Sequence, residues 1–429
     1  MRIASLTFLA VGFYALSACQ MLPYSGSSAT RTDQGAEESP PPLVVIEPEI
    51  PINTPVDLVA PVHVDIWDRV RAGFRLSREI DRKRVLRELE WFVKHPDYVE
   101  RVARRSAPHL YYIVGEIEKS GLPLEFALLP IVESAYDPFA YSHGRASGLW
   151  QFIPSTARLY GLKIDWWYDG RRDIRASTKA AINYLNYLNK VFNGDWLLSL
   201  AAYNSGQGNV LSSIQKSKLP RHQIDFWSLK LLRETQTYVP RLLAISEIIA
   251  NPEGYNIVLP KVPNQPHWQL VDIKAQLGLS KAAELAGISH RSLYFLNPGY
   301  NQWVTHPDGP HDLLVPVDSI ERFKVSLELL PPSQRIAWHR HRIMSGENLD
   351  LIARRFRTTI KTIKSINNIK GTMIRAGDSL LIPAAAADVE YNMTSAARLE
   401  ERQKALTQAY GSEPIIHTVE PGDSLWKIS

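Results

Sequence analysis

The stretch Ala-Leu-Leu-Pro-Ile-Val-Glu-Ser-Ala-Tyr at residues 127–136 is the most informative part of this chain. It places one carboxylate, Glu133, among apolar neighbours. Two polar and aromatic segments follow, Ser-Gly-Leu-Trp-Gln-Phe-Ile-Pro-Ser-Thr at 147–156 and Ala-Ala-Tyr-Asn-Ser-Gly at 201–206. Apolar surroundings disfavour the charged form of a carboxyl group, so its pKa rises and it can donate a proton near neutral pH. This combination predicts an acid/base site suited to cleaving a sugar chain.

These segments together resemble the lytic murein transglycosylases, in the soluble lytic transglycosylase and goose-type lysozyme group. Three further segments, at 168–178, 194–198 and 234–241, strengthen the resemblance because they occur in the family's order and at compatible spacing. The fold class that the resemblance implies is multidomain. We expect a mainly α, lysozyme-like catalytic domain at residues 63–258, followed by small α+β modules.

The resemblance implies a reaction with one carboxylate. Glu133 would protonate the glycosidic oxygen between N-acetylmuramic acid and N-acetylglucosamine, and the N-acetyl group of the muramic residue would assist at its own anomeric carbon. Glu133 would then take the proton of the C6 hydroxyl, which attacks to leave a 1,6-anhydromuramic end. Residues matching the family's glycan-binding positions are Ser142 near the carboxyl, Gln151 facing N-acetyl groups, Tyr203 and Asn204 lining the cleft, and Tyr238, whose hydroxyl can reach the carboxylate.

Two other functions remain open from the sequence. A hydrolytic muramidase normally needs a second carboxylate, and the nearby candidate is Asp137. We interpret Asp137 as a turn residue instead, because it precedes Pro138 and because the family has Asp or Asn at this place. A non-catalytic, peptidoglycan-binding lipoprotein would also fit the termini of the chain, but it would not need Glu133 in its apolar setting.

Composition limits the partners. The chain has 429 residues, a net charge of +5 and a pI near 9.0, which predicts several domains and a mild attraction to an anionic polymer. No Lys/Arg block marks a nucleic-acid face. The histidines show no metal-ligand spacing with cysteine, so we expect no metal and no organic cofactor. We expect His290, His306 and His311 to be surface groups.

The N-terminus predicts a lipid anchor. Arg2 precedes a short apolar run, and the chain's one cysteine, Cys19, follows small residues. Residues 1–18 therefore indicate a secretory signal peptide, too short to span a bilayer stably. Cys19 at the cleavage point resembles the lipidated cysteine of bacterial lipoproteins. By the same resemblance, Gln20 implies the outer membrane, with the protein facing the periplasm. The Pro- and Ser-rich residues 20–62 predict an extended tether.

Capping residues predict several helix ends. Ser177 is a suitable N-cap for a helix that continues to Val191. Asp195 is a suitable N-cap for the next helix, which Gly206 should end. Pro130 and Pro240 each lie inside a helical pattern, where proline kinks the chain at a cost of about 3 kcal/mol.

The C-terminal part contains a repeat. Residues 341–353 align without gaps on residues 417–429. Each copy has a strand pattern, a glycine turn with an acidic neighbour, and a helix cap, which is Asn348 in the first copy. The first copy closes with Leu380-Leu-Ile-Pro383, a second strand. This resembles the LysM module, a βααβ unit that binds glycans containing N-acetylglucosamine, so peptidoglycan strands would be both substrate and LysM ligand.

We divide this part of the chain accordingly. A LysM module is expected at 338–384, a polar spacer at 385–414 and the start of a truncated second LysM at 415–429. A degenerate LysM-like domain is expected at 265–330, because Leu313-Leu-Val-Pro316 has the place and pattern of the closing strand.

Overall fold

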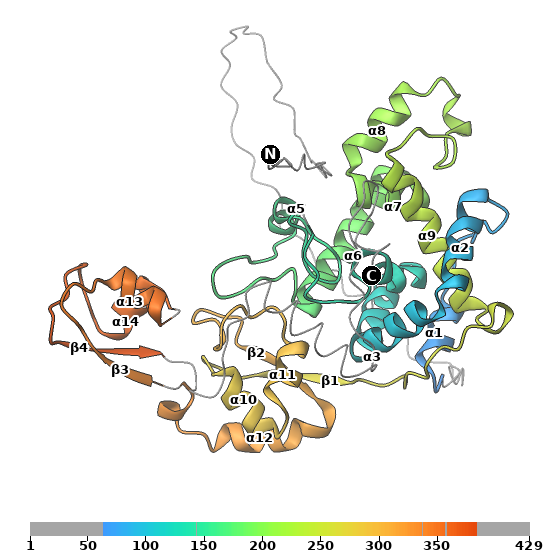
Figure 1. Ribbon diagram of the computed structural model, residues 1–429. Coiled ribbons are helices and arrows are strands. Elements are labelled where there is room, and N and C mark those ends of the chain that lie inside the picture. The colour runs from blue at the N-terminus through green and yellow to red at the C-terminus, as the bar shows by residue number, and fades with distance from the viewer. Residues whose placement is uncertain (1–62, 143, 337, 357, 384–429) are drawn as a thin grey trace, which may run out of the picture.

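The structure is a computed structural model (Figure 1). The expected signal peptide, Cys19, the tether, the spacer and the last repeat lie outside the residues that it describes. Within the described part of the chain, every helix is too short or too polar to cross a membrane. The described residues are 63–142, 144–336, 338–356 and 358–383.

A mainly helical region, residues 63–262, carries the stretch around Glu133. Its helices pack on one apolar core, in which α2 lies along α9 and α7 lies between α6 and α8 (Figure 1). The short 3-10 helix η1 (Leu124–Leu128) leads into α4 and is wholly buried. The α-helices are α1 (Ile66–Ala72), α2 (Lys83–Lys94), α3 (Pro96–Lys119), α4 (Leu129–Ser134), α5 (Pro154–Leu159), α6 (Ile174–Val191), α7 (Trp196–Ser205), α8 (Gln207–Lys216) and α9 (Arg233–Ala250).

The predicted caps of α7 are confirmed, and that of α6 is wrong. Asp195 accepts the N–H of Leu198 at 2.9 Å, and Gly206 ends α7 with φ +87°. Helix α6 begins one turn before Ser177, because Asp173 already caps it by accepting the N–H of Ala176 at 2.6 Å. Ser177 instead lies within the helix, where its hydroxyl donates to the carbonyl of Asp173.

The two prolines have different positions. Pro240 does lie inside α9, as expected. Pro130 does not lie inside a helix: it is the second residue of α4, and the first turn of a helix makes no use of the N–H that proline lacks. The expected kink at Pro130 is therefore wrong, and this proline helps to start the helix that carries Glu133.

A βααβ unit follows the helical region and is called here the inner module (residues 268–328). Its strands pair antiparallel, with Trp268 opposite Pro316 and Asp272 opposite Asp312. Trp268 also packs into the core of the helical region, with its ring 5.1 Å from that of Tyr112. The elements are β1 (Trp268–Asp272), α10 (Leu279–Ala286), α11 (His290–Leu296), β2 (Asp312–Pro316) and an added helix α12 (Ile320–Glu328).

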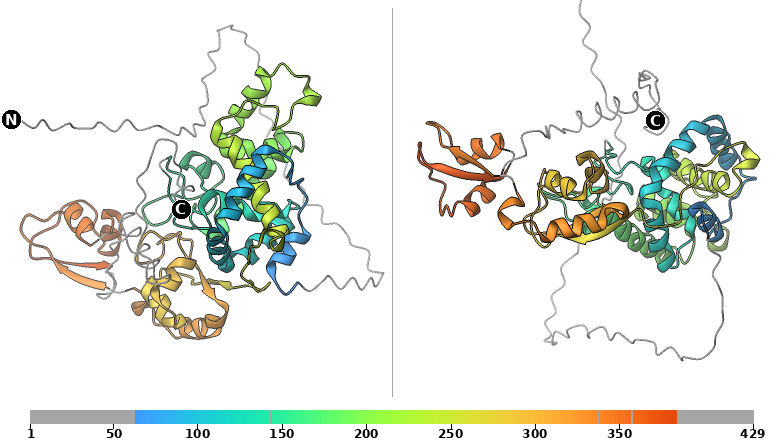
Figure 2. Two further views of the ribbon diagram at one scale, coloured as in Figure 1. Left: turned by 45° about the vertical axis from the view of Figure 1, so that its right-hand side comes forward. Right: turned by 90° about the horizontal axis from the view of Figure 1, so that it is seen from below.

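A second βααβ unit, the outer module (residues 338–383), has a small core of its own. It stands away from α1, α2 and α3 in the views of Figure 2. The predicted cap is confirmed, because Asn348 accepts the N–H of Leu351 at 2.9 Å. Its elements are β3 (Trp338–Arg342), α13 (Leu349–Arg355), α14 (Ile360–Ile366) and β4 (Ser379–Pro383). The expected fold class, a mainly helical region followed by small α+β modules, is confirmed.

Both modules contain the same asparagine clamp. In the inner module, the amide of Asn297 donates to the carbonyls of Leu293 and Leu314, and its oxygen accepts the N–H of Leu314. In the outer module, Asn367 makes the equivalent bonds to Ile363 and Leu381. Each clamp joins the end of the second helix to the second strand. The two units are therefore structural repeats.

Candidate active site

Glu133 lies near the end of α4, a short helix whose other residues are mostly buried and apolar. The chain then turns sharply, because Ala135 and Tyr136 both adopt left-handed backbone angles, with φ 51° and 56°. Such angles are uncommon for residues with side chains and persist only where their surroundings hold them. Here the buried hydroxyl of Tyr136 donates to the carbonyl of Ala127 at 2.6 Å. This bond fixes the turn that sets the position of Glu133.

The carboxyl of Glu133 is half-buried and accepts a hydrogen bond from a phenol. Tyr238, from α9, donates its hydroxyl to Oε1 of Glu133 at 2.5 Å. Burial raises the pKa of Glu133 to about 8; the Tyr238 hydrogen bond opposes this shift, and the charge of Glu234 adds to it. At neutral pH the carboxyl is therefore largely protonated, as a general acid must be. The pKa of Tyr238 is itself raised by burial and by the Glu133 carboxylate, so its phenol keeps its proton.

Tyr203 and Asn204 come from the end of α7. The Tyr203 hydroxyl donates to the carbonyl of Trp150 at 2.9 Å, and burial together with the Glu133 charge raises its pKa. Asn204 accepts the hydroxyl of Thr235 at 2.7 Å, and its amide lies 3.4 Å from an oxygen of Glu234. These bonds tie α7 to the 147–152 segment on one side and to the start of α9 on the other.

Ser142 and Gln151 lie in one folded loop, residues 137–152. The hydroxyl oxygen of Ser142 accepts the N–H of Ala146 at 3.1 Å, which closes a turn. The amide of Gln151 donates to the carbonyls of Ala140 and Gly148, at 3.3 and 2.7 Å. Gln151 has a left-handed φ of 47°. The two bonds from its side-chain nitrogen hold the loop together.

Arg171 holds this loop through hydrogen bonds to two of its carbonyls, a role that the sequence did not indicate. Its guanidinium forms two bonds to Asp169, at 2.9 and 2.7 Å, and donates to the carbonyls of Arg145 and Phe152. Although burial opposes it, the Arg171 hydrogen bond lowers the pKa of Asp169, so the pair is charged. Gly148 packs so closely that a Cβ there would lie 1.9 Å from the Arg171 carbonyl. The 168–178 segment was one of those that carried the family resemblance, but nothing in it indicated that Arg171 would hold the loop.

The expectation that His306 is a surface group is wrong. Its side chain is buried, its Nε2 lies 3.0 Å from Oδ2 of Asp165, and its Nδ1 accepts the N–H of Asp308 at 2.8 Å. The partner comes from the helical region, so His306 is part of an interface between domains. Among the described residues, no group of three His, Cys, Asp or Glu side chains is placed to hold a metal ion.

Comparison with known proteins decides the family. The chain is 36% identical over 376 residues to membrane-bound lytic murein transglycosylase D of Escherichia coli (strain K12), covering 85% of this chain and 79% of that protein. This chain belongs to the membrane-bound lytic murein transglycosylase D family. It is therefore a lytic murein transglycosylase family enzyme, as the sequence motifs predicted.

Three domain families match along the chain. Residues 112–225 match the transglycosylase SLT domain, and residues 267–331 match the LysM-like domain of lytic transglycosylase D. Residues 341–383 and 417–429 match the LysM domain. The first match contains Glu133, and the second corresponds to the inner module.

Two solved structures of lytic transglycosylases are more distant. An inactive mutant of lytic transglycosylase Slt from Pseudomonas aeruginosa is 23% identical, covering 35% of this chain and 25% of that chain, with a TM-score of 0.28. The 70 kDa soluble lytic transglycosylase of Escherichia coli is 22% identical, covering 39% and 30%, with a TM-score of 0.30. At these TM-scores the likeness supports no inference about this chain.

Proposed function

We propose that this protein cleaves the β-1,4 bond between N-acetylmuramic acid and N-acetylglucosamine in peptidoglycan, and that Glu133 is its single acid/base. The observation that supports this most is the half-buried carboxyl, with a pKa raised to about 8 and a hydrogen bond from Tyr238. Family membership supports the substrate class.

The reaction proceeds in two steps. Protonated Glu133 gives its proton to the glycosidic oxygen, the bond from that oxygen to the anomeric carbon breaks, and the N-acetyl oxygen of the muramic residue stabilises that carbon. The Glu133 carboxylate then takes the proton of the C6 hydroxyl, whose oxygen bonds to the same carbon. Glu133 ends protonated, as it began, and no water is consumed. The attacking hydroxyl belongs to the same sugar, which gives it a high effective concentration.

Tyr238 stabilises the carboxylate form of Glu133, which takes the proton of the C6 hydroxyl in the second step. A phenol hydrogen bond favours the charged form of the carboxyl, while burial favours the neutral form. Glu133 can therefore occupy both forms during one turnover. We assign glycan binding to Ser142 and Gln151 of the 137–152 loop and to Tyr203 and Asn204 at the end of α7.

The remaining parts of the chain hold the enzyme to its polymer. The outer module binds N-acetylglucosamine-containing strands, in keeping with its match to the LysM domain. A lipid on Cys19 anchors the protein to the outer membrane, facing the periplasm. The name of the Escherichia coli relative, which includes the words membrane-bound, supports attachment to a membrane.

Digestion of purified sacculi tests the reaction. The full chain should release 1,6-anhydromuropeptides, which mass spectrometry separates from hydrolysed products because they are lighter by one water. A correctly folded Glu133→Gln variant should release almost none. Muramic acid with a free reducing end as the main product would favour the hydrolytic muramidase, and absence of any product would favour a peptidoglycan-binding lipoprotein.

A further inference from the structure

The inner module is docked on the catalytic region through the long loop between α11 and β2. The N–H of Asp169 donates to the carbonyl of Gly299 at 2.8 Å, and Arg172 Nε donates to the carbonyl of Pro298 at 2.8 Å. Asn301 contributes most: its N–H donates to the carbonyl of Trp167 at 2.8 Å, and its amide donates to that of Asp165 at 3.0 Å. Its oxygen also accepts from Arg172.

These contacts reach Asp169 and Arg172, which stand on either side of the arginine that holds the active-site loop. Asp169, whose N–H the module engages, is the same residue that orients Arg171. Arg171 in turn donates to the carbonyls of Arg145 and Phe152, at 2.5 and 3.3 Å. A continuous path of hydrogen bonds therefore runs from the α11–β2 loop to the 137–152 loop. Every charged group on this path is buried, so water competes little for the bonds.

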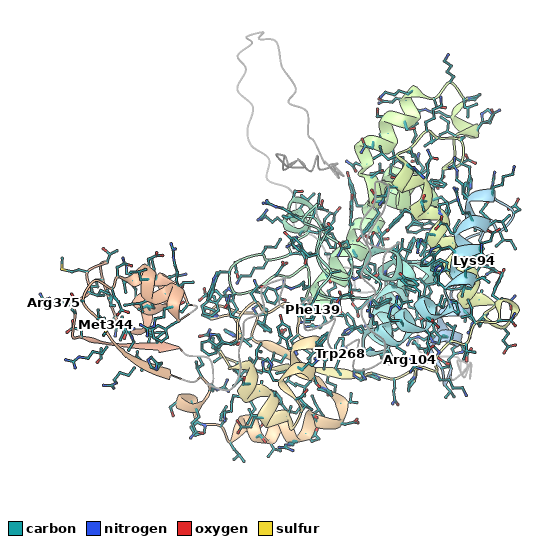
Figure 3. The ribbon with its side chains drawn as sticks, viewed as in Figure 1. Lys94, Arg104, Phe139, Trp268, Met344 and Arg375 are labelled. Carbon is teal, nitrogen blue, oxygen red and sulfur yellow. The ribbon has the colours of Figure 1, made fainter. Side chains whose placement is uncertain are left out.

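A second contact reaches the same loop directly. Phe139 stacks on Tyr294 of α11, with ring centroids 5.0 Å apart, and meets the edge of Phe295 at 5.3 Å. Figure 3 shows Phe139 and Trp268 where the inner module meets the helical region. The next residue, Ala140, has the carbonyl that accepts the bonds from Gly148 and Gln151. The module thus touches the loop beside the residues that fold it.

The outer module does not make such contacts within the described part of the chain. Its equivalent loop, residues 367–378, bonds inside the module: Ile369 donates to Lys364, and Gly377 donates to Ile343. The two repeats share the asparagine clamp but differ in what surrounds it. The difference lies in the loop that the inner module uses for docking.

We propose that the inner module is a positioning element of the active site, and that it acts through Asn301 and Phe295 on the loop 137–152 beside Glu133. The inference rests on the proposed function. The module fixes the loop in the geometry that the reaction needs, because misplacement of a site by about 1 Å can lower a rate about a hundredfold. It therefore affects turnover more than it affects retention on the polymer.

The test uses the full chain and the double variant Phe295→Ala with Asn301→Ala. Phe295 is 40% exposed, so its loss spares the core of the module. The matched control is Val325→Ala, which removes a 56% exposed apolar side chain from α12 of the same module. Phe295→Tyr, which keeps the ring, serves as the conservative variant. Two quantities are measured: kcat and KM for anhydro-product release from a short glycan, and amide hydrogen exchange of residues 137–152.

The double variant should lose about tenfold or more in kcat, with KM within about twofold, and its loop amides should exchange faster. The control and Phe295→Tyr should match the wild type in both. A folded double variant with wild-type kcat and wild-type exchange would overturn the inference, as would an equal loss in Val325→Ala. If the double variant does not fold, the same comparisons on Phe295→Ala alone decide. Hydrogen exchange needs no turnover, so a wild-type protein without anhydro product would count against the proposed function only.

Discussion

The hydroxyl of Tyr238 lies 2.5 Å from Oε1 of Glu133, although 105 positions separate the two residues in the sequence. This contact brings α9 onto the end of α4. It favours the charged form of a carboxyl whose burial favours the neutral form. The balance between the two determines when Glu133 can give a proton and when it can take one back.

Replacing Glu133 by Gln should remove turnover and leave the fold intact. The amide has nearly the same shape but can neither give nor take the catalytic proton. A general acid/base contributes about 10²- to 10⁴-fold, and more when one group serves two steps. Product release from sacculi and the circular dichroism spectrum check this together. More than about a tenth of the wild-type rate in a folded variant would exclude Glu133 from this role.

The same substitution should change how stability depends on pH. Glu133 ionises near its ordinary pKa of 4.5 in the unfolded chain, but only near 8 in the folded protein. Between these values the folded state holds one more proton, so this residue makes the free energy of unfolding fall as pH rises from about 4.5 to about 8. The Gln variant lacks the effect. Urea unfolding at pH 5 and pH 8 should show the variant gaining stability relative to the wild type, and an equal difference at both values would contradict the raised pKa.

Replacing Tyr238 by Phe should lower the rate and raise the alkaline limit, which is the pH above which activity is lost. The lost bond stabilised the carboxylate, so the pKa of Glu133 rises further and activity persists to higher pH. The maximal rate should fall about tenfold or more, because a hydrogen bond to a charged group is worth about 1.5–3 kcal/mol. A pH profile of kcat measures both effects. Tyr203→Phe is the matched control: its hydroxyl bonds to Trp150, so the alkaline limit should stay in place.

Asp137→Asn should keep most of the activity, within about threefold. Oδ1 of Asp137 accepts the N–H of Phe139 at 3.1 Å, and an asparagine oxygen can do the same. Asp137→Ala should lose about 1 kcal/mol of stability, because it removes this hydrogen bond. Muropeptide release and thermal unfolding distinguish these outcomes. If the folded Asn variant lost a hundredfold in rate, Asp137 would be a second catalytic carboxylate.

Removing everything after residue 335 should weaken retention on sacculi but leave cleavage of short glycans largely intact. The outer module has its own core, and short glycans fill only the catalytic site. On the polymer, two linked sites raise the effective concentration of each for the other. A sacculus pull-down measures retention, and an assay on a short glycan measures cleavage. Unchanged retention would remove the proposed role of the outer module, and a lost short-glycan activity would make it part of the catalytic fold.

Local signals in the sequence were enough to predict the setting of Glu133 and two of the helix caps. The apolar run around Glu133 and the caps Asp195 and Asn348 depend on near neighbours, so they could be read directly. The cap of α6 was ambiguous, because Asp173 and Ser177 are both suitable and stand one turn apart. The choice between them depends on what packs against the helix.

Contacts between distant segments could not be predicted in this way. His306 is buried at an interface between domains, where its Nε2 lies 3.0 Å from Oδ2 of Asp165, 141 positions away. Phe139 meets Tyr294 only once the inner module has docked. Nothing near either residue in the sequence indicates its partner. Binding by Ser142 and Gln151 stays a prediction, since their observed bonds fold the loop.

The asparagine clamp has a consequence for how independent each repeat is. Asn297 and Asn367 each join helix to strand within one repeat, so a repeat can satisfy its own backbone without a neighbour. Copies added beyond the outer module would lengthen the reach of the enzyme along the wall and leave its chemistry unchanged. The inner repeat lacks that independence, because Asn301 bonds it to Arg172 and Asp165. The inner repeat is therefore bonded to the catalytic region, whereas the described loop of the outer repeat is bonded within its own module.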